Sequence, residues 1–165
     1  MSTLVEPARD VAVRIADLAV VAAPMRLTTS GLGSCIAIIV HDATARIGGL
    51  AHVLLPNPPG AASGHPAKFV NTAVPDLLAR MRALGATEAI TARLVGGARM
   101  FSALLPAGMP AVGDRNVAAA REALQHAGIP VIGEDVGGEF GRSVVLDVSA
   151  GTVCVQSFAR DARLI

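Results

Sequence analysis

Residues 35–55 read CIAIIVHDATARIGGLAHVLL, two apolar runs separated by a short polar segment. The first run, residues 35–40, is rich in branched side chains, which is typical of a buried strand. The second run, residues 46–55, continues as a strand that contains a glycine pair. Because residues 41–45 have the composition of a turn, the stretch predicts a β-hairpin.

Two later segments have apolar residues at helical spacing. The first pattern covers residues 70–84 and the second covers residues 117–127, and a glycine follows each. Pro75 lies inside the first pattern, so we expect that helix to start near Pro75 or to bend there. Asn116 is expected to cap the second helix.

Further apolar runs predict additional strands before and after the helices. They cover residues 11–15, 18–23, 89–95, 129–132, 143–148 and 152–155. Since hairpin-like pairs come first and the helices follow, we expect an α+β fold, a layered sandwich rather than a strict alternation of strands and helices. At 165 residues the chain suits a single domain, residues 1–165.

The composition excludes several classes of function. The chain is 52% hydrophobic and 16% charged, with a net charge of +1 and no Trp or Tyr. It therefore lacks the excess of basic side chains and the Trp and Tyr rings with which proteins bind nucleic acids, and we expect no nucleic-acid partner. The first ten residues include Glu6, Arg9 and Asp10 and no apolar segment, so they do not predict a signal peptide. Apolar runs elsewhere are shorter than the ~20 residues of a membrane span, which predicts a cytoplasmic protein without membrane insertion.

The cysteines and histidines suggest neither a disulfide scaffold nor a metal site. Cys35 and Cys154 are too few and too far apart for a disulfide framework. No two His or Cys residues stand at the spacing of metal ligands, so we expect no metal ion and no other cofactor.

The residues before Cys35 read TTSGLGSC over positions 28–35. Gly31-x-Gly33 begins like a dinucleotide-binding fingerprint, but that motif needs a helix after it, and the run that follows here is strand-like. A P-loop is excluded because no Gly-Lys-Ser/Thr follows. The stretch therefore favours a loop that presents a thiol, with backbone N–H groups close enough to the sulfur to face an oxyanion.

A catalytic thiol needs a base, and His52 is the candidate. With a turn near residues 42–45, the antiparallel partner of Cys35 falls near position 52, which would bring the two Cβ atoms to about 5 Å. Thr28, Thr29 or Ser34 could then orient the imidazole. The spacing alone leaves open, and slightly favours, a core histidine that bonds a backbone carbonyl.

Residues 56–66 form the one clear loop, because Pro and Gly dominate them. A long loop in a compact domain is often a binding element or a lid. A plain surface connection is an equally good interpretation.

Six blocks of sequence follow one another in order across about residues 10–155. They are Thr29-x-x-Leu32-Gly33-Ser34-Cys35, Gly48-Gly49-x-Ala51-His52-x-x-Leu55-Pro56, Lys68-Phe69-Val70-Asn71-Thr72-Ala73, Gly96-Gly97-Ala98-x-Met100-Phe101, Val112-Gly113-x-Arg115-Asn116 and Asp135-x-Gly137-Gly138-x-x-Gly141-Arg142. Together these blocks resemble the chemoreceptor glutamine deamidase family CheD. The first two are highly specific, whereas the glycine blocks would be weak alone.

The resemblance implies a protein-glutamine deamidase, an amidohydrolase that converts particular glutamines of methyl-accepting chemotaxis receptors to glutamates through a cysteine thioester. It implies that Cys35 is the nucleophile, that His52 is the base and later the acid, and that Thr29 orients His52. Backbone groups of Gly33, Ser34 and Cys35 are the candidates for the oxyanion hole. Some family members also act as receptor methylesterases.

The family's fold is an α/β/β sandwich, which it shares with the catalytic domain of cytotoxic necrotizing factor toxins. The resemblance therefore implies mixed or antiparallel sheets, with the two main helices on one face. The expected partners are the receptors, as substrate, and a CheC-like phosphatase, which regulates some members. Asn71 stands where the family more often carries Asp, and Pro75 follows it in the same helical pattern, so this segment departs from the family's pattern.

Two other functions stay open at this level. One is a docking module for receptors or for a CheC-like phosphatase, without turnover of its own. The other is a thiol-dependent hydrolase of a small amide or ester.

Overall fold

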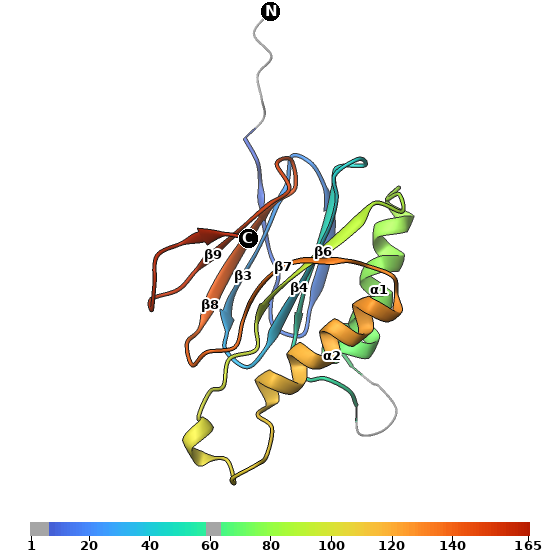
Figure 1. Ribbon diagram of the computed structural model, residues 1–165. Helices are drawn as coiled ribbons and strands as arrows, with labels where there is room; N and C mark the ends of the chain where they lie inside the picture. The colour runs from blue at the N-terminus through green and yellow to red at the C-terminus, as the bar shows by residue number, and fades with distance from the viewer. Residues whose placement is uncertain (1–6, 59–63) are drawn as a thin grey trace, which may run out of the picture.

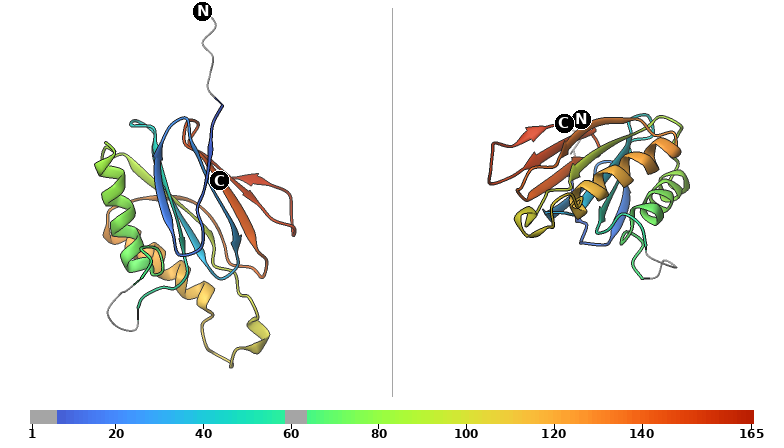
Figure 2. Two further views of the ribbon diagram at one scale, coloured as in Figure 1. Left: turned by 180° about the vertical axis from the view of Figure 1, so that it is seen from behind. Right: turned by 60° about the horizontal axis from the view of Figure 1, so that its bottom comes forward.

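The computed structural model describes residues 7–58 and 64–165. The start of the chain, on which the expectation about a signal peptide rests, and the centre of the Pro/Gly-rich loop lie outside these residues. The described part forms three layers, with the two α-helices on one side of a central sheet and an outer sheet on the other (Figure 1, Figure 2). This arrangement confirms the expected α+β sandwich. None of the described helices has both the length and the apolar character that crossing a membrane requires.

The central sheet has five strands in the order β2-β5-β4-β6-β7. Its strands are β2 (Leu18–Ala22), β4 (Ile36–Asp42), β5 (Ile47–Val53), β6 (Ile90–Gly96) and β7 (Val131–Val136). Strands β4 and β5 are the predicted hairpin, and every residue of both is buried. Strands β6 and β7 are parallel, so the sheet is mixed.

The outer sheet also has five strands, in the order β1-β3-β8-β9-β10. Its strands are β1 (Asp10–Ala12), β3 (Arg26–Leu32), β8 (Arg142–Asp147), β9 (Thr152–Gln156) and β10 (Arg163–Leu164). Only the pairing of β1 with β3 is parallel. The alternating burial of β8 is typical of a sheet with one face packed and one face toward water.

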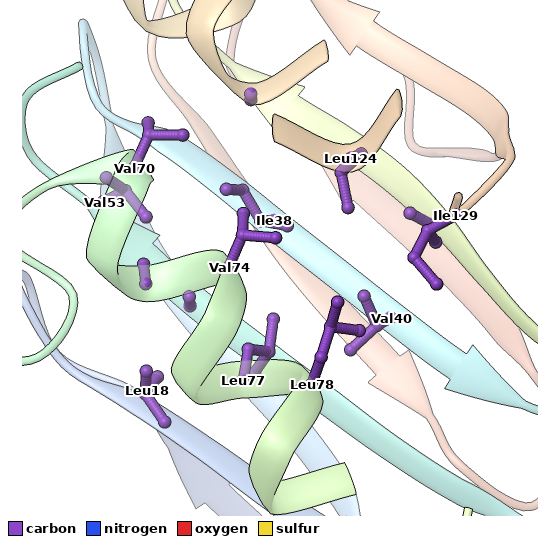
Figure 3. Close-up of a cluster of buried hydrophobic side chains, with 14 of the residues drawn as sticks. Leu18, Ile38, Val40, Val53, Val70, Val74, Leu77, Leu78, Leu124 and Ile129 are labelled. Atoms are coloured by element: carbon purple, nitrogen blue, oxygen red, sulfur yellow. The ribbon is translucent and has the colours of Figure 1, made fainter. Parts of the chain in front are cut away.

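Both helices, α1 (Val70–Ala83) and α2 (Val112–His126), pack on the central sheet. Figure 3 shows Val74, Leu77 and Leu78 of α1 pointing toward β4 and β5, with Leu124 of α2 beside them. Burial of each such side chain contributes about 1.5–3 kcal/mol. A short 3-10 helix, η1 (Ser102–Leu104), lies in the connection between β6 and α2.

A second apolar core lies between the two sheets. Its buried residues are Val13, Leu27, Leu32, Cys35, Ala37, Ile39, Leu50, Val95, Val144, Leu146, Val148, Val153 and Val155. Because side chains alternate along a strand, these residues show which face of each strand is turned toward the opposite sheet.

Helix α1 begins where its apolar pattern begins rather than near Pro75, and helix α2 begins earlier than the sequence suggested. Helix α1 starts at Val70 and runs through Pro75. Pro75 has no N–H to donate to the carbonyl of Asn71, but both residues are exposed, so water can bond that carbonyl instead. Helix α2 starts at Val112, with Ala111 as its N-cap residue and no side-chain cap. The expectation that Asn116 caps this helix is therefore wrong, since Asn116 lies in the second turn and is fully buried.

Candidate active site

A hydrogen bond joins the two sheets inside the sandwich. Thr29 on β3 lies opposite Val144 in the outer sheet, and His52 on β5 lies opposite Ala37 in the central sheet. Both partners belong to the inter-sheet core, so Thr29 and His52 point toward each other across it. The Thr29 Oγ1 and His52 Nδ1 atoms are 2.7 Å apart, and both residues are buried.

The partners of Thr29 fix the tautomer of the imidazole. Thr29 Oγ1 is also 2.7 Å from the carbonyl oxygen of Val13, which can only accept a hydrogen bond. The single hydroxyl proton of Thr29 is therefore donated to Val13, and Oγ1 must accept a proton from His52 Nδ1. The Nε2 atom then carries a lone pair, and it is buried without a hydrogen-bond partner in the part of the chain that the structure describes.

The backbone of His52 is held by the segment that crosses from β1 to β2. The His52 N–H donates to the carbonyl of Asp17 at 3.0 Å, and the Ala16 N–H donates to the carbonyl of His52 at 2.9 Å. Ala16 adopts a left-handed conformation, with φ of 63°, which is uncommon for a residue with a side chain. Side chain and backbone of His52 are thus both fixed.

Cys35 lies in the loop between β3 and β4, immediately before β4, and packs in the inter-sheet core. The residue that pairs with His52 is Ala37, so the register is shifted by two positions from a direct pairing of Cys35 with His52, which is within the range that the turn allowed. Cys35 and Ala37, the residue opposite His52, both belong to the inter-sheet core, so Cys35 lies on the same side of the central sheet as His52, offset diagonally by two residues. No hydrogen bond joins them in this structure.

Burial keeps both groups neutral. It raises the pKa of the Cys35 thiol above the ordinary value of 9.0, and the N–H of Cys35 itself partly opposes this effect. It also lowers the pKa of His52 below the ordinary value of 6.5. At neutral pH the site therefore holds a thiol and a neutral imidazole, which can accept a proton at Nε2.

Three successive carbonyls around the thiol are held by donors. The Gly33 carbonyl accepts from the Ala98 N–H at 2.9 Å, and the Cys35 carbonyl accepts from the Gly97 N–H at 2.8 Å. The Ser34 carbonyl accepts from Asn116 Nδ2 at 2.8 Å. The carbonyls of Gly33 and Ser34 are thus fixed beside Cys35, and the role of these residues in an oxyanion hole stays a prediction.

A pocket of about 600 Å³ reaches the Thr29–His52 pair. Its lining residues are Ala12, Val13, Arg14, Ile15, Thr28, Thr29, Ser30, Gly31, His52, Ser143, Val144 and Val145. Strand β3 has a bulge between Thr29 and Leu32 beside this pocket, a feature that is common next to active sites. Cys35 does not line the pocket, so the structure brings Thr29 and His52 to it but not the thiol.

An exposed apolar segment lies next to the Cys35 loop and was missed by sequence reasoning. Phe101, Leu104 and Met109 are 75%, 81% and 61% exposed in the connection before α2, which projects from the layers in Figure 1. Met100 of the same segment packs against Gly33, where an added Cβ would lie 3.2 Å from Met100 Cγ. The signal in the sequence was the Met100-Phe101 pair in a glycine-rich block.

A buried ion pair closes the end of the sandwich near the bulge. Asp135 on β7 accepts from Arg142 on β8 at 2.9 Å, and both side chains are 2% exposed. Arg160 and Arg163 also pair with Asp135. Within the described ranges, no three His, Cys, Asp or Glu side chains come together as metal ligands would.

Comparison with known proteins identifies relatives over almost the whole chain. The model of the CheD family, described as CheD chemotactic sensory transduction, matches residues 54–157. A protein of Desulfitobacterium hafniense named "Probable chemoreceptor glutamine deamidase CheD" is 40% identical over 94% of this chain and 98% of its own. Proteins of the same name from Moorella thermoacetica and Haloarcula marismortui are 38% and 41% identical, covering 100% and 91% of this chain and 100% and 86% of their own. The chain therefore belongs to the CheD family.

Proposed function

We propose that this protein is a deamidase of chemoreceptor glutamines, with Cys35 as nucleophile and His52 as base and acid. The observation that carries the proposal is the Thr29–His52 hydrogen bond, which leaves a lone pair on Nε2 at the face of the sheet that Cys35 shares. The names of the relatives supply the substrate class.

The reaction would start when the Cys35 thiol gives its proton to His52 Nε2. The thiolate then attacks the glutamine Cδ, and the carbonyl oxygen becomes an oxyanion next to the N–H groups of Ser34 and Cys35. His52 returns the proton to the amide nitrogen, and ammonia leaves as the thioester forms. Water, deprotonated by His52, hydrolyses the thioester to glutamate and free thiol.

The diagonal offset of Cys35 and His52 means that the two groups must approach each other when substrate binds. Catalytic hydrogen bonds are often long in free enzymes and tighten only in the complex. The neutral resting pair is consistent with this sequence, because it leaves the thiol weakly reactive until substrate is present.

The exposed apolar segment favours a protein substrate over a small amide. Exposed Phe, Leu and Met side chains next to a reactive loop are typical of a surface that binds another protein. We propose that the cytoplasmic signalling helices of receptors bind there. A methyl ester at the same receptor position presents the same acyl carbon, so methylesterase activity would need no further group.

The test uses the two cysteines as a matched pair. Receptor cytoplasmic fragments are incubated with the wild type, with Cys35→Ala or with Cys154→Ala, and each receptor glutamine is followed by mass spectrometry. Cys154 lies on β9 and is partly exposed, so its variant controls for thiol loss. We expect Cys154→Ala to convert glutamine as the wild type does and Cys35→Ala to convert none.

Conversion by Cys35→Ala at the wild-type rate would refute the assignment of the nucleophile. If Cys35→Ala instead restores adaptation in cells, the protein acts as a docking module for receptors. Binding to a CheC-like phosphatase stays a prediction from the family, and co-purification with that partner tests it.

A further inference from the structure

Asn116 connects the loop before Cys35 to the strand that carries His52. Its Nδ2 group donates both of its protons, one to the Ser34 carbonyl at 2.8 Å and one to the Leu54 carbonyl at 3.1 Å. Ser34 directly precedes Cys35, and Leu54 lies two residues after His52. One side chain on α2 therefore bonds the main chain on both sides of the candidate catalytic pair.

The orientation of this amide is unambiguous. Both of its partners are carbonyls, which can only accept, so the nitrogen and not the oxygen must face them. The Asn116 Oδ1 atom is left buried with no partner among the described residues. An unpaired buried acceptor costs about 1–3 kcal/mol, a cost that the fold carries at this position.

The hydrogen bond to Ser34 also sets the direction of the next N–H group. The Ser34 carbonyl and the Cys35 N–H belong to one planar trans peptide unit, in which the two groups point in opposite directions. A donor that fixes the carbonyl therefore fixes the N–H as well. The Cys35 N–H and the thiol belong to the same residue, so this N–H lies within a few bonds of the reacting sulfur.

Close contact between α2 and the β6–α2 connection brings Asn116 within reach. Gly113 lies one turn before Asn116, and a Cβ at that position would come 2.2 Å from the Ala98 carbonyl oxygen. Gly97 and Ala98 in turn hold the carbonyls of Cys35 and Gly33. The helix and this connection thus act on the same loop from adjacent positions.

We propose that Asn116 is a positioning residue, which aims the Cys35 N–H at the oxyanion formed when Cys35 attacks an acyl carbon. The role rests on Cys35 being the nucleophile, as in the proposed function, but it can be tested without a receptor. Acylation of Cys35 by p-nitrophenyl acetate passes through an oxyanion, whereas alkylation by iodoacetamide does not. The ratio of the two rates therefore reports on the oxyanion donor and not on the reactivity of the thiol.

The experiment compares Asn116→Leu with Leu124→Ala, both in a Cys154→Ala background that leaves one thiol. Leu124 is fully buried on the same helix but belongs to the core between the helices and the central sheet, whereas Cys35 belongs to the inter-sheet core, so the Leu124 variant controls for lost stability. We expect Asn116→Leu to lower the ratio of acylation to alkylation by about 10- to 100-fold, since misplacing a reacting group costs up to about 100-fold. Leu124→Ala should leave the ratio unchanged.

A ratio for Asn116→Leu within about twofold of the control overturns the proposal, since oxyanion donors are worth far more. An equal loss of the acylation and alkylation rates also overturns the proposal, because it would mean that the substitution affects only the reactivity of the thiol. If Asn116→Leu does not fold, Asn116→Asp keeps the shape of the side chain, and only its protonated form can donate. Its ratio relative to wild type should fall as pH rises, and a relative ratio near one at every pH overturns the proposal.

The result is distinguishable from failure of the proposed function. A wild-type protein that converts no receptor glutamine refutes deamidation, whatever the ratio. A ratio that does not respond to Asn116 refutes the positioning role, even when receptor glutamines are converted.

Discussion

Replacing Thr29 with valine isolates the hydroxyl that orients His52. Valine keeps the branched shape, so packing against the inter-sheet core is retained while both hydrogen bonds are lost. The Nδ1–H of His52 and the carbonyl of Val13 are then buried without partners. The imidazole can recover a partner only by moving its proton or turning its ring, and either change takes the lone pair on Nε2 away from the face of Cys35.

The size of the effect follows from the hydrogen bond that is removed. A buried donor left without an acceptor costs about 1–3 kcal/mol. If that free energy holds the Nδ1–H tautomer, its loss lowers the population of the reactive form by about 5- to 150-fold, since 1.4 kcal/mol is a factor of ten. We therefore expect kcat for receptor deamidation to fall by about 10- to 100-fold, with KM little changed.

Two measurements test this reasoning, with Thr29→Ser as the matched control because it keeps the hydroxyl. Mass spectrometry of receptor fragments gives kcat, and nitrogen NMR of the histidine rings shows which nitrogen of His52 carries the proton. The wild type and Thr29→Ser should carry it on Nδ1. A Thr29→Val variant with kcat within about twofold of the wild type, or a wild-type proton on Nε2, refutes the argument.

Two further predictions concern pH and the contact of α2. Because burial lowers the pKa of His52, the imidazole stays neutral to more acidic pH, and kcat/KM should fall on the acid side with a midpoint below 6.5. Because burial raises the pKa of Cys35, the thiolate absorbance of Cys35, measured in Cys154→Ala, should rise with a midpoint above pH 9.0. An acid midpoint at or above 6.5, or thiolate at neutral pH, contradicts this. Gly113→Ala should lower the free energy of unfolding by about 2 kcal/mol or more, although alanine normally stabilises a helix by about 1 kcal/mol over glycine, because the new Cβ would meet the Ala98 carbonyl. Denaturant unfolding measures this change. Gly128, which follows the same helix, cannot serve as a control site, because its φ of 72° would itself strain an alanine.

The elements that the sequence predicts well are those with a local signal. The hairpin of β4 and β5 follows from two apolar runs and a turn, and both helices follow from their spacing. Strand β3 was missed because its polar and glycine residues read as a loop. It is a strand through its pairing with β1 and β8, and β8 lies more than a hundred residues further along the chain.

In the candidate site, too, the sequence predicts what has a local signal and misses what depends on distant segments. The residue types of Cys35, His52 and Thr29 pointed to thiol chemistry, but the turn length left the register uncertain, and the structure moves the partner of His52 to Ala37. The contact between Thr29 and His52 joins two different sheets, so no pairing rule within one sheet could predict it. Asn116 was assigned to a cap because asparagine favours caps, whereas its partners come from distant segments.

The layering of the fold explains how the candidate site is held in place. The central sheet carries His52 on β5, and β4 of the same sheet begins directly after Cys35. The outer sheet fixes the imidazole through Thr29, and the helix layer fixes the loop of Cys35 through Asn116. The two neighbouring layers thus hold different groups of the proposed reaction: the outer sheet holds the proposed base, and the helix layer holds the loop with the proposed oxyanion donor.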